Sequence, residues 1–383
     1  MGMIGGGQGA FIGNVHRMAA ALDGKIELVA GAFSGRAEVS AATGLALGLE
    51  TSRVYADYRE MLESEQRLPS DKRIDLVSIV TPNYLHFEAV KLALEHGFHV
   101  MCEKPVAFSY EEANALLQLQ KQYGKIVALT HNYTGYPMIK EARALTRSGK
   151  LGKLRKIIAE YPQGWLSDRI EATGQKQAYW RTNPEMAGAS GCVGDIGTHA
   201  ENLIEYITGL RIQYLAADVS AMVEGRLLDD DANILIRMEQ GVKGVIIASQ
   251  IANGDENELR IRIYGEKGGI EWLQSEPNTL HYKSNSGPRQ LLKPGGYAWL
   301  STQTNKHSRL PGGHPEGYIE SMANLYRNVA LAIEAEKNGD SPDPDLDFPI
   351  LEDGVRGMKF IEAVIRSGNK NAAWIAMDEE EFS

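Results

Sequence analysis

The stretch that decides the fold is MIGGGQGAFIGNVHRMAAAL, residues 3–22. The end of an apolar strand runs into Gly5, Gly7 and Gly9, and an apolar helix follows. In a nucleotide-binding β-α-β unit, such glycines allow a tight turn and a close approach of the backbone to pyrophosphate, and the helix N-terminus supplies N–H groups. The spacing leaves two interpretations. Either Gly5-x-Gly7-x-x-Ala10 is the G-x-G-x-x-A variant, or Gly13 marks the true helix start after an insertion of about three residues.

The rest of the first third alternates between strand and helix patterns. A helix pattern over 86–97 ends at Gly97, and Ser109 with Glu112 forms a capping box before a helix that runs to about Tyr123. Strands are predicted at 26–33, 74–82, 98–105 and 125–131. Repeated β-α-β units with short loops predict a parallel sheet covered by helices, so the fold class is α/β.

The rhythm changes after about residue 132. Helix patterns cover 137–148 and about 195–208, and two more are predicted at 316–337 and 350–368. Strands are predicted at 154–161, 213–223, 232–238, 243–252, 259–264, 269–274 and 279–283. Short turns between these strands indicate an antiparallel sheet, and residues 284–315 indicate a long loop. We therefore expect a dinucleotide-binding domain over 1–131 and a second α/β domain over 132–383.

Composition excludes several classes of partner. The formal charge is −10 over 383 residues, which argues against a nucleic acid or an anionic membrane surface as the main partner. No run of 18 apolar residues or signal-peptide pattern is visible, so a cytoplasmic protein without a membrane span is expected. Two cysteines without Cys-x-x-Cys spacing, and histidines without metal-helix spacing, predict neither a disulfide framework nor a metal site.

The end of the second strand bears on the choice of cofactor. An acidic residue at this position binds the adenosine ribose hydroxyls of NAD, whereas a small polar residue with a nearby Arg suits the 2′-phosphate of NADP. This chain has Ser34 and Arg36 and no acidic residue at the tip. The pattern favours NADP(H) within an NAD(P) site, and the alternative is that Arg36 is a solvent-exposed loop residue.

Two further stretches carry candidate chemistry. In CEKPVAFS (102–109), Lys104 follows a buried strand and so lies at the carboxyl end of the sheet, where open α/β folds bind ligands. In GCVGDIGTHAENLIEYITG (191–209), Asp195 and His199 are i,i+4 neighbours at the edge of an apolar helical stripe. Each feature taken alone also suits a structural role, either a loop lysine or a carboxylate-held histidine at a helix start.

Four motifs occur together in order: Gly5-Gly6-Gly7 with His16, TPNYLH (81–86), EKP (103–105) and DIGTH (195–199). In this combination the chain resembles the glucose–fructose oxidoreductase/inositol dehydrogenase family, Gfo/Idh/MocA. The resemblance implies an N-terminal Rossmann domain and a C-terminal α/β domain with an open, mostly antiparallel sheet. It also implies an NAD(P)-dependent dehydrogenase that transfers a hydride between the nicotinamide and a ring hydroxyl or ketone of a sugar, a sugar derivative or a cyclitol.

The resemblance assigns catalytic roles to Lys104, Asp195 and His199. His199 would take the hydroxyl proton, Asp195 would fix its tautomer, and Lys104 would stabilise charge on the same oxygen. Whether Lys104 or His199 is the formal base stays open, and the family's often cis Lys-Pro bond falls on Lys104–Pro105. The expected cofactor contacts are Gly5, Gly7, Gln8, Gly9, Ala10, Ser34, Arg36, Thr81, Asn83, His86, Glu103 and Lys104.

Additional substrate contacts are expected around the same site. Trp180 and Arg181 precede the DIGTH helix, and an aromatic face with a guanidinium suits a sugar ring. A structural Trp beside an ion-paired Arg is the alternative. His314 lies after a long loop and Tyr133 follows the last strand of the first domain, so both are candidates for the substrate pocket beside Lys104, Asp195 and His199.

Two other activities keep the same fold. One is an NAD-dependent glycosidase that acts through transient oxidation, and the other is a non-catalytic sensor of nucleotide or sugar. The presence of both Lys104 and His199 argues against the sensor. We also expect a homodimer or homotetramer, because an open sheet with helices on one face leaves its other face to be covered.

Overall fold

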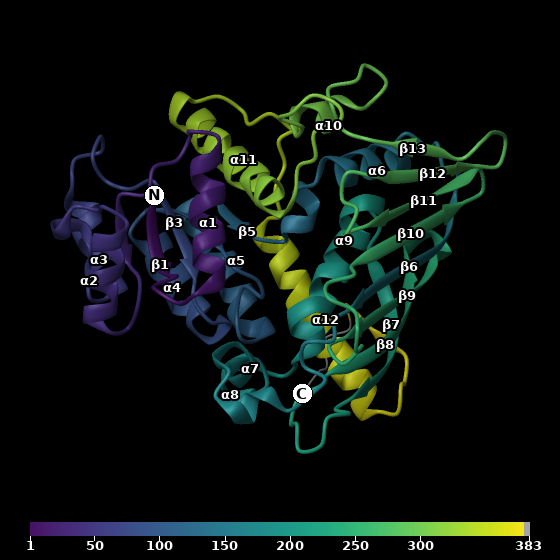
Figure 1. Ribbon diagram of the computed structural model, residues 1–383, viewed down its shortest axis with the longest axis horizontal. Coiled ribbons are helices and arrows are strands. Elements are labelled where there is room, and N and C mark those ends of the chain that lie inside the picture. The colour runs from purple at the N-terminus through teal and green to yellow at the C-terminus, as the bar shows by residue number, and fades with distance from the viewer. Residues whose placement is uncertain (379–383) are drawn as a thin grey trace. The chain divides into compact units, whose positions relative to one another are not determined.

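A computed structural model describes residues 1–378 (Figure 1). The chain forms two compact units. Unit 1 contains residues 1–135 and 318–355, and unit 2 contains residues 136–317 and the chain from 356 onward.

Unit 1 is built on a five-stranded parallel sheet in the order β2-β1-β3-β4-β5. Its strands are β1 (Gly2–Gly5), β2 (Ala30–Ala32), β3 (Leu76–Val80), β4 (His99–Cys102) and β5 (Val127–Leu129). Its first five helices are α1 (Phe11–Leu22), α2 (Ala37–Ala46), α3 (Tyr58–Arg67), α4 (His86–Glu95) and α5 (Tyr110–Tyr123). The predicted Rossmann architecture is confirmed, and α2 and α3 are two helices that the sequence pattern did not indicate.

Local signals set the ends of α4 and α5. Ser109 accepts a hydrogen bond from the backbone N–H of Glu112 at 3.3 Å, and Gly124 ends α5 at a φ of +64°. Gly97, at a φ of +80°, follows α4. Both glycines adopt the left-handed conformation that helix ends favour, as their positions in the sequence predicted.

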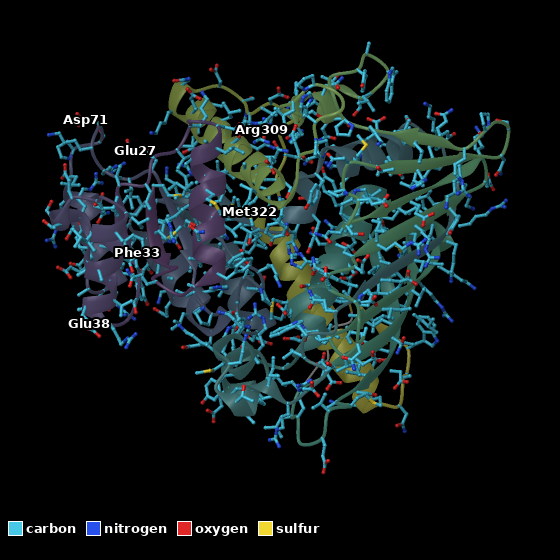
Figure 2. The ribbon with its side chains drawn as sticks, in the orientation of Figure 1. Glu27, Phe33, Glu38, Asp71, Arg309 and Met322 are labelled. Carbon is cyan, nitrogen blue, oxygen red and sulfur yellow. The ribbon has the colours of Figure 1, made fainter. Side chains whose placement is uncertain are left out.

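Helix α11 (Tyr318–Asn338) belongs to unit 1, although the sequence division at 131/132 placed it in the second domain. It packs against α1, and its buried side chains join the core of the parallel sheet. Phe33 and Met322, both labelled in Figure 2, lie in this one core although 289 residues separate them along the chain. The physical reason is that the apolar stripe of α11 packs against the core of the first unit.

Unit 2 contains a nine-stranded sheet in the order β13-β12-β11-β10-β6-β9-β8-β7-β14. The strands are β6 (Leu154–Pro162), β7 (Ile212–Ser220), β8 (Asp231–Met238), β9 (Lys243–Ser249), β10 (Arg260–Gly265), β11 (Gly268–Leu273), β12 (Leu280–Ser284), β13 (Gln290–Leu292) and β14 (Ile375–Ala376). β6 pairs with β9 in parallel, whereas the other neighbours pair antiparallel. The mostly antiparallel sheet is therefore confirmed.

Helices cover one face of this sheet. α6 (Pro137–Arg147) packs on β11 and β12, and α9 (Thr198–Thr208) packs on β6. α12 (Leu351–Asn369) begins in unit 1, and its residues from 356 on belong to unit 2. Two short helices, α7 (Lys176–Arg181) and α8 (Pro184–Ala187), precede α9 in the chain.

The segment 284–315, predicted to be a continuous loop, contains regular structure, so that prediction is wrong in part. β13 pairs antiparallel with β12, and α10 (Thr302–Lys306) has Ser301 as its N-cap. The buried carboxylate of Glu141 accepts hydrogen bonds from the Ser301 N–H at 2.9 Å and the Thr304 hydroxyl at 2.8 Å. This long-range contact with α6 fixes α10, and nothing in the local pattern indicates it.

The described part of the chain offers neither a membrane span nor a metal cluster. No helix within residues 1–378 combines the length and apolarity that a membrane span needs. The same residues include no group of three or more His, Cys, Asp or Glu side chains placed to hold a metal ion.

Candidate functional site

The glycine loop joins β1 to α1 in unit 1. Gly5, Gly6 and Gly9 have φ values of +83°, +73° and +81°, a region that side-chain-bearing residues rarely adopt. The N–H of Gly7 donates to the carbonyl of Phe33 at 3.0 Å, and a Cβ on Gly7 would stand 2.8 Å from that oxygen. A Cβ on Gly9 would meet nothing within 4 Å, so this part of the loop is open.

Helix α1 begins at Phe11, which decides between the two interpretations of the loop. The interpretation in which Gly13 marks the helix start is wrong, because Gly13 lies within the first turn. A Cβ on Gly13 would stand 2.4 Å from the Cα of Gly6. Gly13 therefore permits the close approach of helix and loop, the task of a third glycine in dinucleotide-binding turns. With an open loop at a helix N-terminus, the residues present fit a dinucleotide cofactor.

The tip after β2 carries the two residues expected to select the cofactor. The Ser34 hydroxyl accepts a hydrogen bond from the Arg36 N–H at 3.2 Å. The Arg36 side chain is 74% exposed, and its Nε lies 3.9 Å from a carboxylate oxygen of Glu38, which Figure 2 labels. Arg36 is thus a solvent-exposed cation with a weak ionic partner.

The EKP corner follows β4. The Lys104–Pro105 bond is cis, as the resemblance implied. One oxygen of Glu103 lies 2.7 Å from His16 Nε2, and the other accepts a hydrogen bond from the Lys104 N–H at 3.3 Å. Burial acts to raise the pKa of Glu103, but the hydrogen bond from His16 and the charge of Lys104 are among the interactions that outweigh it and lower this pKa to about 2.

His86 lies on the other side of the corner. Its Nδ1 lies 2.7 Å from the Pro105 carbonyl and its Nε2 lies 2.8 Å from the Thr81 carbonyl. Burial lowers the pKa of His86, and Asn83 is buried on the neighbouring turn. These contacts give His86 a role in holding two loops together at the carboxyl end of the sheet.

In unit 2, a π-helical turn (Val193–Gly197) carries Asp195 and runs directly into α9. The carboxylate of Asp229 accepts the backbone N–H groups of Gly191 and Val193 at 2.8 Å each, and the Ser190 hydroxyl accepts that of Gly194 at 3.0 Å. Such turns widen the helix and are frequent at functional sites. The sequence predicted the helix but not this widened first turn.

Asp195 is the centre of a polar cluster. Its Oδ2 accepts hydrogen bonds from Arg181 Nε at 3.1 Å and from Gln250 Nε2 at 2.9 Å. Arg181 also donates to Gln177 Oε1 at 2.6 Å, and its guanidinium carbon lies 4.2 Å from the centre of the Trp180 ring. Arg181 therefore contacts Asp195 directly, and Trp180 lies beside Arg181.

The cluster continues along the ends of β6 and β9. Asn257 Oδ1 accepts hydrogen bonds from Tyr161 at 2.8 Å and from Gln163 Nε2 at 2.6 Å. Trp165 Nε1 donates to Gln163 Oε1 at 3.0 Å. The ring of His199 lies 6.3 Å from that of Tyr161, centre to centre. Asp195 and His199, the two predicted catalytic residues of unit 2, therefore lie beside one group of amide and aromatic side chains.

Tyr133 and His314, the two remaining predicted substrate residues, belong to different units. Tyr133 is buried in unit 1, in the turn that follows β5. His314 is exposed in unit 2, and its Nδ1 lies 3.2 Å from the Pro311 carbonyl.

Sequence reasoning missed several residues of these two groups. Gln163 and Trp165 follow the predicted strand 154–161, Gln250 lies inside the predicted strand 243–252, and Asn257 lies just before the predicted strand 259–264, so no single local signal marked them. His131 was also missed, although it ends the predicted strand 125–131. Burial and, to a smaller extent, the charge of Lys104 lower the pKa of His131 to about 3.

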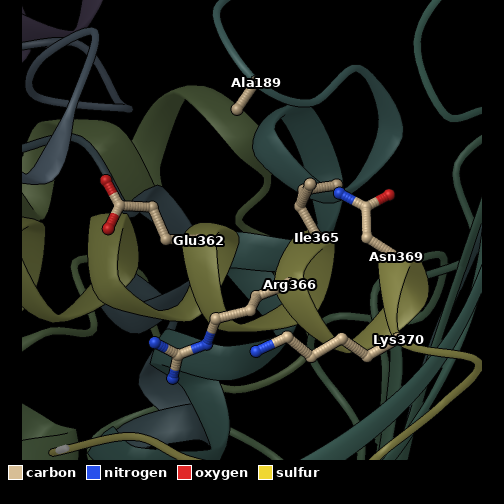
Figure 3. A pocket seen from close by; sticks show the side chains of 6 residues that line it. All are labelled: Ala189, Glu362, Ile365, Arg366, Asn369 and Lys370. Carbon is tan, nitrogen blue, oxygen red and sulfur yellow. The ribbon is translucent and has the colours of Figure 1, made fainter. Parts of the chain in front are cut away.

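A separate pocket of about 360 Å³ lies in unit 2 along α12. It is lined by Ala189, Glu362, Ile365, Arg366, Asn369 and Lys370 (Figure 3). Arg366 also donates to the Ala376 carbonyl at 3.2 Å, so it helps to hold β14. Because none of the predicted site residues lines this pocket, we do not assign the candidate site to it.

Two family models match the chain in succession. Residues 1–131 match the oxidoreductase family with an NAD-binding Rossmann fold, and residues 139–271 match the GFO/IDH/MocA C-terminal domain. The chain belongs to the Gfo/Idh/MocA oxidoreductase family. The Rossmann match ends at residue 131, whereas unit 1 of the structure also contains α11.

Individual relatives agree with this membership. The chain is 35% identical to the uncharacterised oxidoreductase YfiI of Bacillus subtilis over 97% of this chain and 95% of the relative. It is 28% identical to levoglucosan dehydrogenase of Pseudarthrobacter phenanthrenivorans over 70% of this chain and 72% of the relative. An inositol dehydrogenase homologue from Azotobacter vinelandii, solved with NAD⁺, superposes with a TM-score of 0.92 at 35% identity. The superposition covers 98% of this chain and 96% of the homologue. The same homologue was also solved with NADH and myo-inositol.

As a member of this family, the chain is a Rossmann-fold dehydrogenase. Its glycine loop, EKP corner and DIGTH turn are the segments that carried the resemblance. Unit 1 holds the first two segments and unit 2 holds the third.

Proposed function

We propose that the protein is an NAD(P)-dependent dehydrogenase that oxidises one ring hydroxyl of an uncharged cyclitol or sugar, or reduces the matching ketone. The observation that carries this proposal is the Asp195 cluster, in which a carboxylate, a guanidinium, amides and indole rings surround the DIGTH turn. Such a set of donors, acceptors and aromatic faces suits a polyol ring.

The charge of the cluster supports an uncharged substrate. Its guanidinium, Arg181, is ion-paired with Asp195 at 3.1 Å, so its positive charge is balanced within the protein. A phosphorylated sugar would need a cation that is not neutralised in this way. The complex of the Azotobacter vinelandii homologue with myo-inositol points to the same substrate class.

We assign the cofactor to the glycine loop of unit 1, with the N–H groups at the start of α1 facing the pyrophosphate. The other proposed contacts are Ser34, Arg36, Thr81, Asn83, His86, Glu103 and Lys104. When bound, the nicotinamide accepts or supplies the hydride. Ser34 and Arg36 would meet the adenosine ribose, and the Arg36 cation would favour NADP over NAD.

The protein's residues supply binding and proton transfer in this proposal. His199 accepts the proton of the reacting hydroxyl, Asp195 orients the site from the π-helical turn, and Lys104 donates a hydrogen bond to the same oxygen and stabilises its developing negative charge. Either Lys104 or His199 can be the formal base. The convergence of Lys104 and His199 on one oxygen is part of the proposal.

Absorbance of the reduced nicotinamide tests the reaction. The purified protein is mixed with NAD⁺ or NADP⁺ and with inositols, levoglucosan and glucose, and glucose 6-phosphate serves as the charged control. The proposal predicts NAD(P)H formation with at least one uncharged polyol and a weaker response to the phosphate. Glycoside cleavage without net NAD(P)H would indicate the transient-oxidation mechanism, and binding without turnover would indicate a sensor; either result contradicts the dehydrogenase.

We further propose that the uncovered face of the unit 2 sheet forms a homodimer or homotetramer. This face presents Leu235, which is 51% exposed, and its cross-strand neighbour Val245, which pairs with Ile158 on the next strand. Apolar side chains in register on an open face are typical of an interface. Light scattering at micromolar concentration should give a multiple of the chain mass, and Leu235→Glu should lower it. A wild-type monomer would contradict the proposal.

A further inference from the structure

A row of polar side chains crosses the core of unit 1. The Ser78 hydroxyl on β3 lies 2.7 Å from the Tyr326 hydroxyl on α11, and that hydroxyl lies 2.6 Å from Nδ1 of His16 on α1. His16 Nε2 lies 2.7 Å from the Glu103 carboxylate that follows β4. Four segments far apart in the sequence thus contribute to one chain of hydrogen bonds.

Most of this row is fully buried. Ser78, Tyr326 and His16 are each 0% exposed, and the side chain of Glu103 is 14% exposed. A buried polar group that lacks a partner costs about 1–3 kcal/mol, so a row of this kind persists when every member is satisfied. The tyrosine and histidine rings also meet edge to face, with centres 5.6 Å apart.

One assignment of hydrogens satisfies all four groups with a neutral imidazole. The Glu103 carboxylate can only accept, so His16 donates from Nε2 and its Nδ1 becomes an acceptor. Tyr326 then donates to Nδ1, and Ser78 donates to the Tyr326 oxygen. Burial raises the pKa of Tyr326 strongly, so its phenol stays a donor at every ordinary pH. The tyrosine hydroxyl therefore selects the Nε2–H tautomer of His16.

The other end of the row reaches Lys104. The second oxygen of Glu103 accepts the backbone N–H of Lys104 at 3.3 Å, and the backbone N–H of Glu103 donates to the Ile79 carbonyl at 3.0 Å. A shift of the Glu103 carboxylate would therefore move the backbone from which the lysine projects. His86 holds the next residue, Pro105, through its carbonyl.

We infer that Tyr326 and His16 are positioning residues that hold Glu103, and through it Lys104, in the geometry that the reaction needs. The inference rests on the proposed role of Lys104. Neither residue touches the reacting atoms in this account, because both lie in the core of unit 1. Helix α11 thus supplies a functional side chain to the Rossmann unit as well as apolar packing.

Tyr326→Phe is the first test, because the ring remains and only the hydroxyl is lost. We expect kcat to fall about tenfold, because the variant loses one buried hydrogen bond to the His16 ring. KM for the cofactor should change less than about threefold. His16→Gln keeps a side-chain donor toward Glu103 and should retain more activity than His16→Ala. Tyr326→Phe with wild-type kcat would overturn the inference.

Tyr55→Phe is the matched control. Tyr55 is a second buried tyrosine of unit 1, and its hydroxyl donates to Glu65 at 3.1 Å, outside the row. Both variants lose a buried phenol–polar contact, so both should lower the melting temperature to a similar degree. Only Tyr326→Phe should lower kcat. Equal loss of kcat in the two variants would mean that Tyr326 acts through stability alone, and the inference would fail.

A spectroscopic measurement separates this inference from the proposed function. In ¹⁵N-histidine-labelled protein, His16, assigned through His16→Gln, should appear as the Nε2–H tautomer, and Tyr326→Phe should move its Nδ1 resonance. The Nδ1–H tautomer in the wild type would overturn the inference even if the enzyme is active. A wild type that reduces no cofactor, but shows the expected resonances, would refute the proposed function and leave the hydrogen-bonded row established.

Discussion

Gln250 Nε2 donates a hydrogen bond to Asp195 Oδ2 over 2.9 Å and so ties the end of β9 to the π-helical turn. The same oxygen accepts from Arg181, which belongs to α7. One carboxylate oxygen therefore joins three segments of unit 2. This arrangement gives Asp195 a fixed orientation, which a carboxylate on a single flexible helix face would lack.

Replacing Gln250 by Ala should reduce kcat/KM about 10- to 100-fold. The reason is the loss of a hydrogen bond to a charged group, about 1.5–3 kcal/mol, at a proposed catalytic site. Steady-state kinetics measures the loss, and titration of NADH fluorescence should show cofactor affinity near that of the wild type. Gln213→Ala, at an exposed position of β7, is the control. Equal kinetics for the two variants would remove Gln250 from the site.

Lys104→Met should lower kcat by at least 100-fold, because the nearly isosteric side chain cannot donate to the reacting oxygen. Cofactor affinity should change less than threefold. Lys91→Met, on the surface of α4 where Lys91 pairs with Glu88 at 3.6 Å, should be neutral. Turnover by Lys104→Met within a few fold of the wild type would refute the role given to the lysine.

Gly13→Ala should destabilise the protein by about 1–3 kcal/mol and weaken cofactor binding. The added Cβ would meet the Gly6 backbone at 2.4 Å, and a backbone contact cannot be relieved by a side-chain rotation. Urea unfolding and NADH titration measure the two effects. Gly287→Ala, where a Cβ meets nothing within 4 Å, is the control. A stable Gly13→Ala variant with normal NADH affinity would contradict the packing role of Gly13.

His131 should make stability depend on pH. Its pKa is about 3 in the folded protein and about 6.5 when unfolded, so between these values the unfolded chain binds one more proton. Stability should therefore fall as the pH drops from about 6.5 toward 3, by up to about 1.4 kcal/mol per pH unit from this group. Urea unfolding from pH 4.5 to 7 should show a slope that is smaller in His131→Gln. Identical slopes would show that His131 titrates normally in the folded state.

Arg36 should contribute to the choice between cofactors. Arg36→Ala should raise KM for NADP at least fivefold and leave KM for NAD within twofold, because the cation can pair with the 2′-phosphate. Glu38→Gln releases Arg36 from its partner at 3.9 Å and should lower KM for NADP. Equal changes in KM for NADP and KM for NAD would show that Arg36 acts only through its general charge and does not select the cofactor.

The sequence patterns predicted the Rossmann unit well, because turns and caps are local. The Ser109 cap and the Gly124 end each depend on residues within about one helical turn, and the glycines of the Gly5 to Ala10 turn are adjacent in the sequence. The mostly antiparallel sheet of the second unit was likewise visible from its short strands and turns.

Long-range packing could not be predicted in the same way. The return of α11 to unit 1 depends on how Met322 and Tyr326 fit beside Phe33 and His16, and no local pattern records that fit. Gln163 and Gln250 reach the Asp195 cluster because β6 and β9 pair in parallel, a pairing that short turns between consecutive strands do not reveal. The motifs therefore supplied the proposed reactive side chains, whereas the residues that hold them came from the structure.

A crystal structure of the enzyme with reduced cofactor and a turned-over polyol tests the central claim most directly. The account predicts that Lys104 Nζ and one ring nitrogen of His199 both lie within about 3.2 Å of a single substrate oxygen, a hydrogen-bond distance. If the two nitrogens contact different oxygens, or if either faces away from the bound polyol, the proposed division of labour between the two units is contradicted.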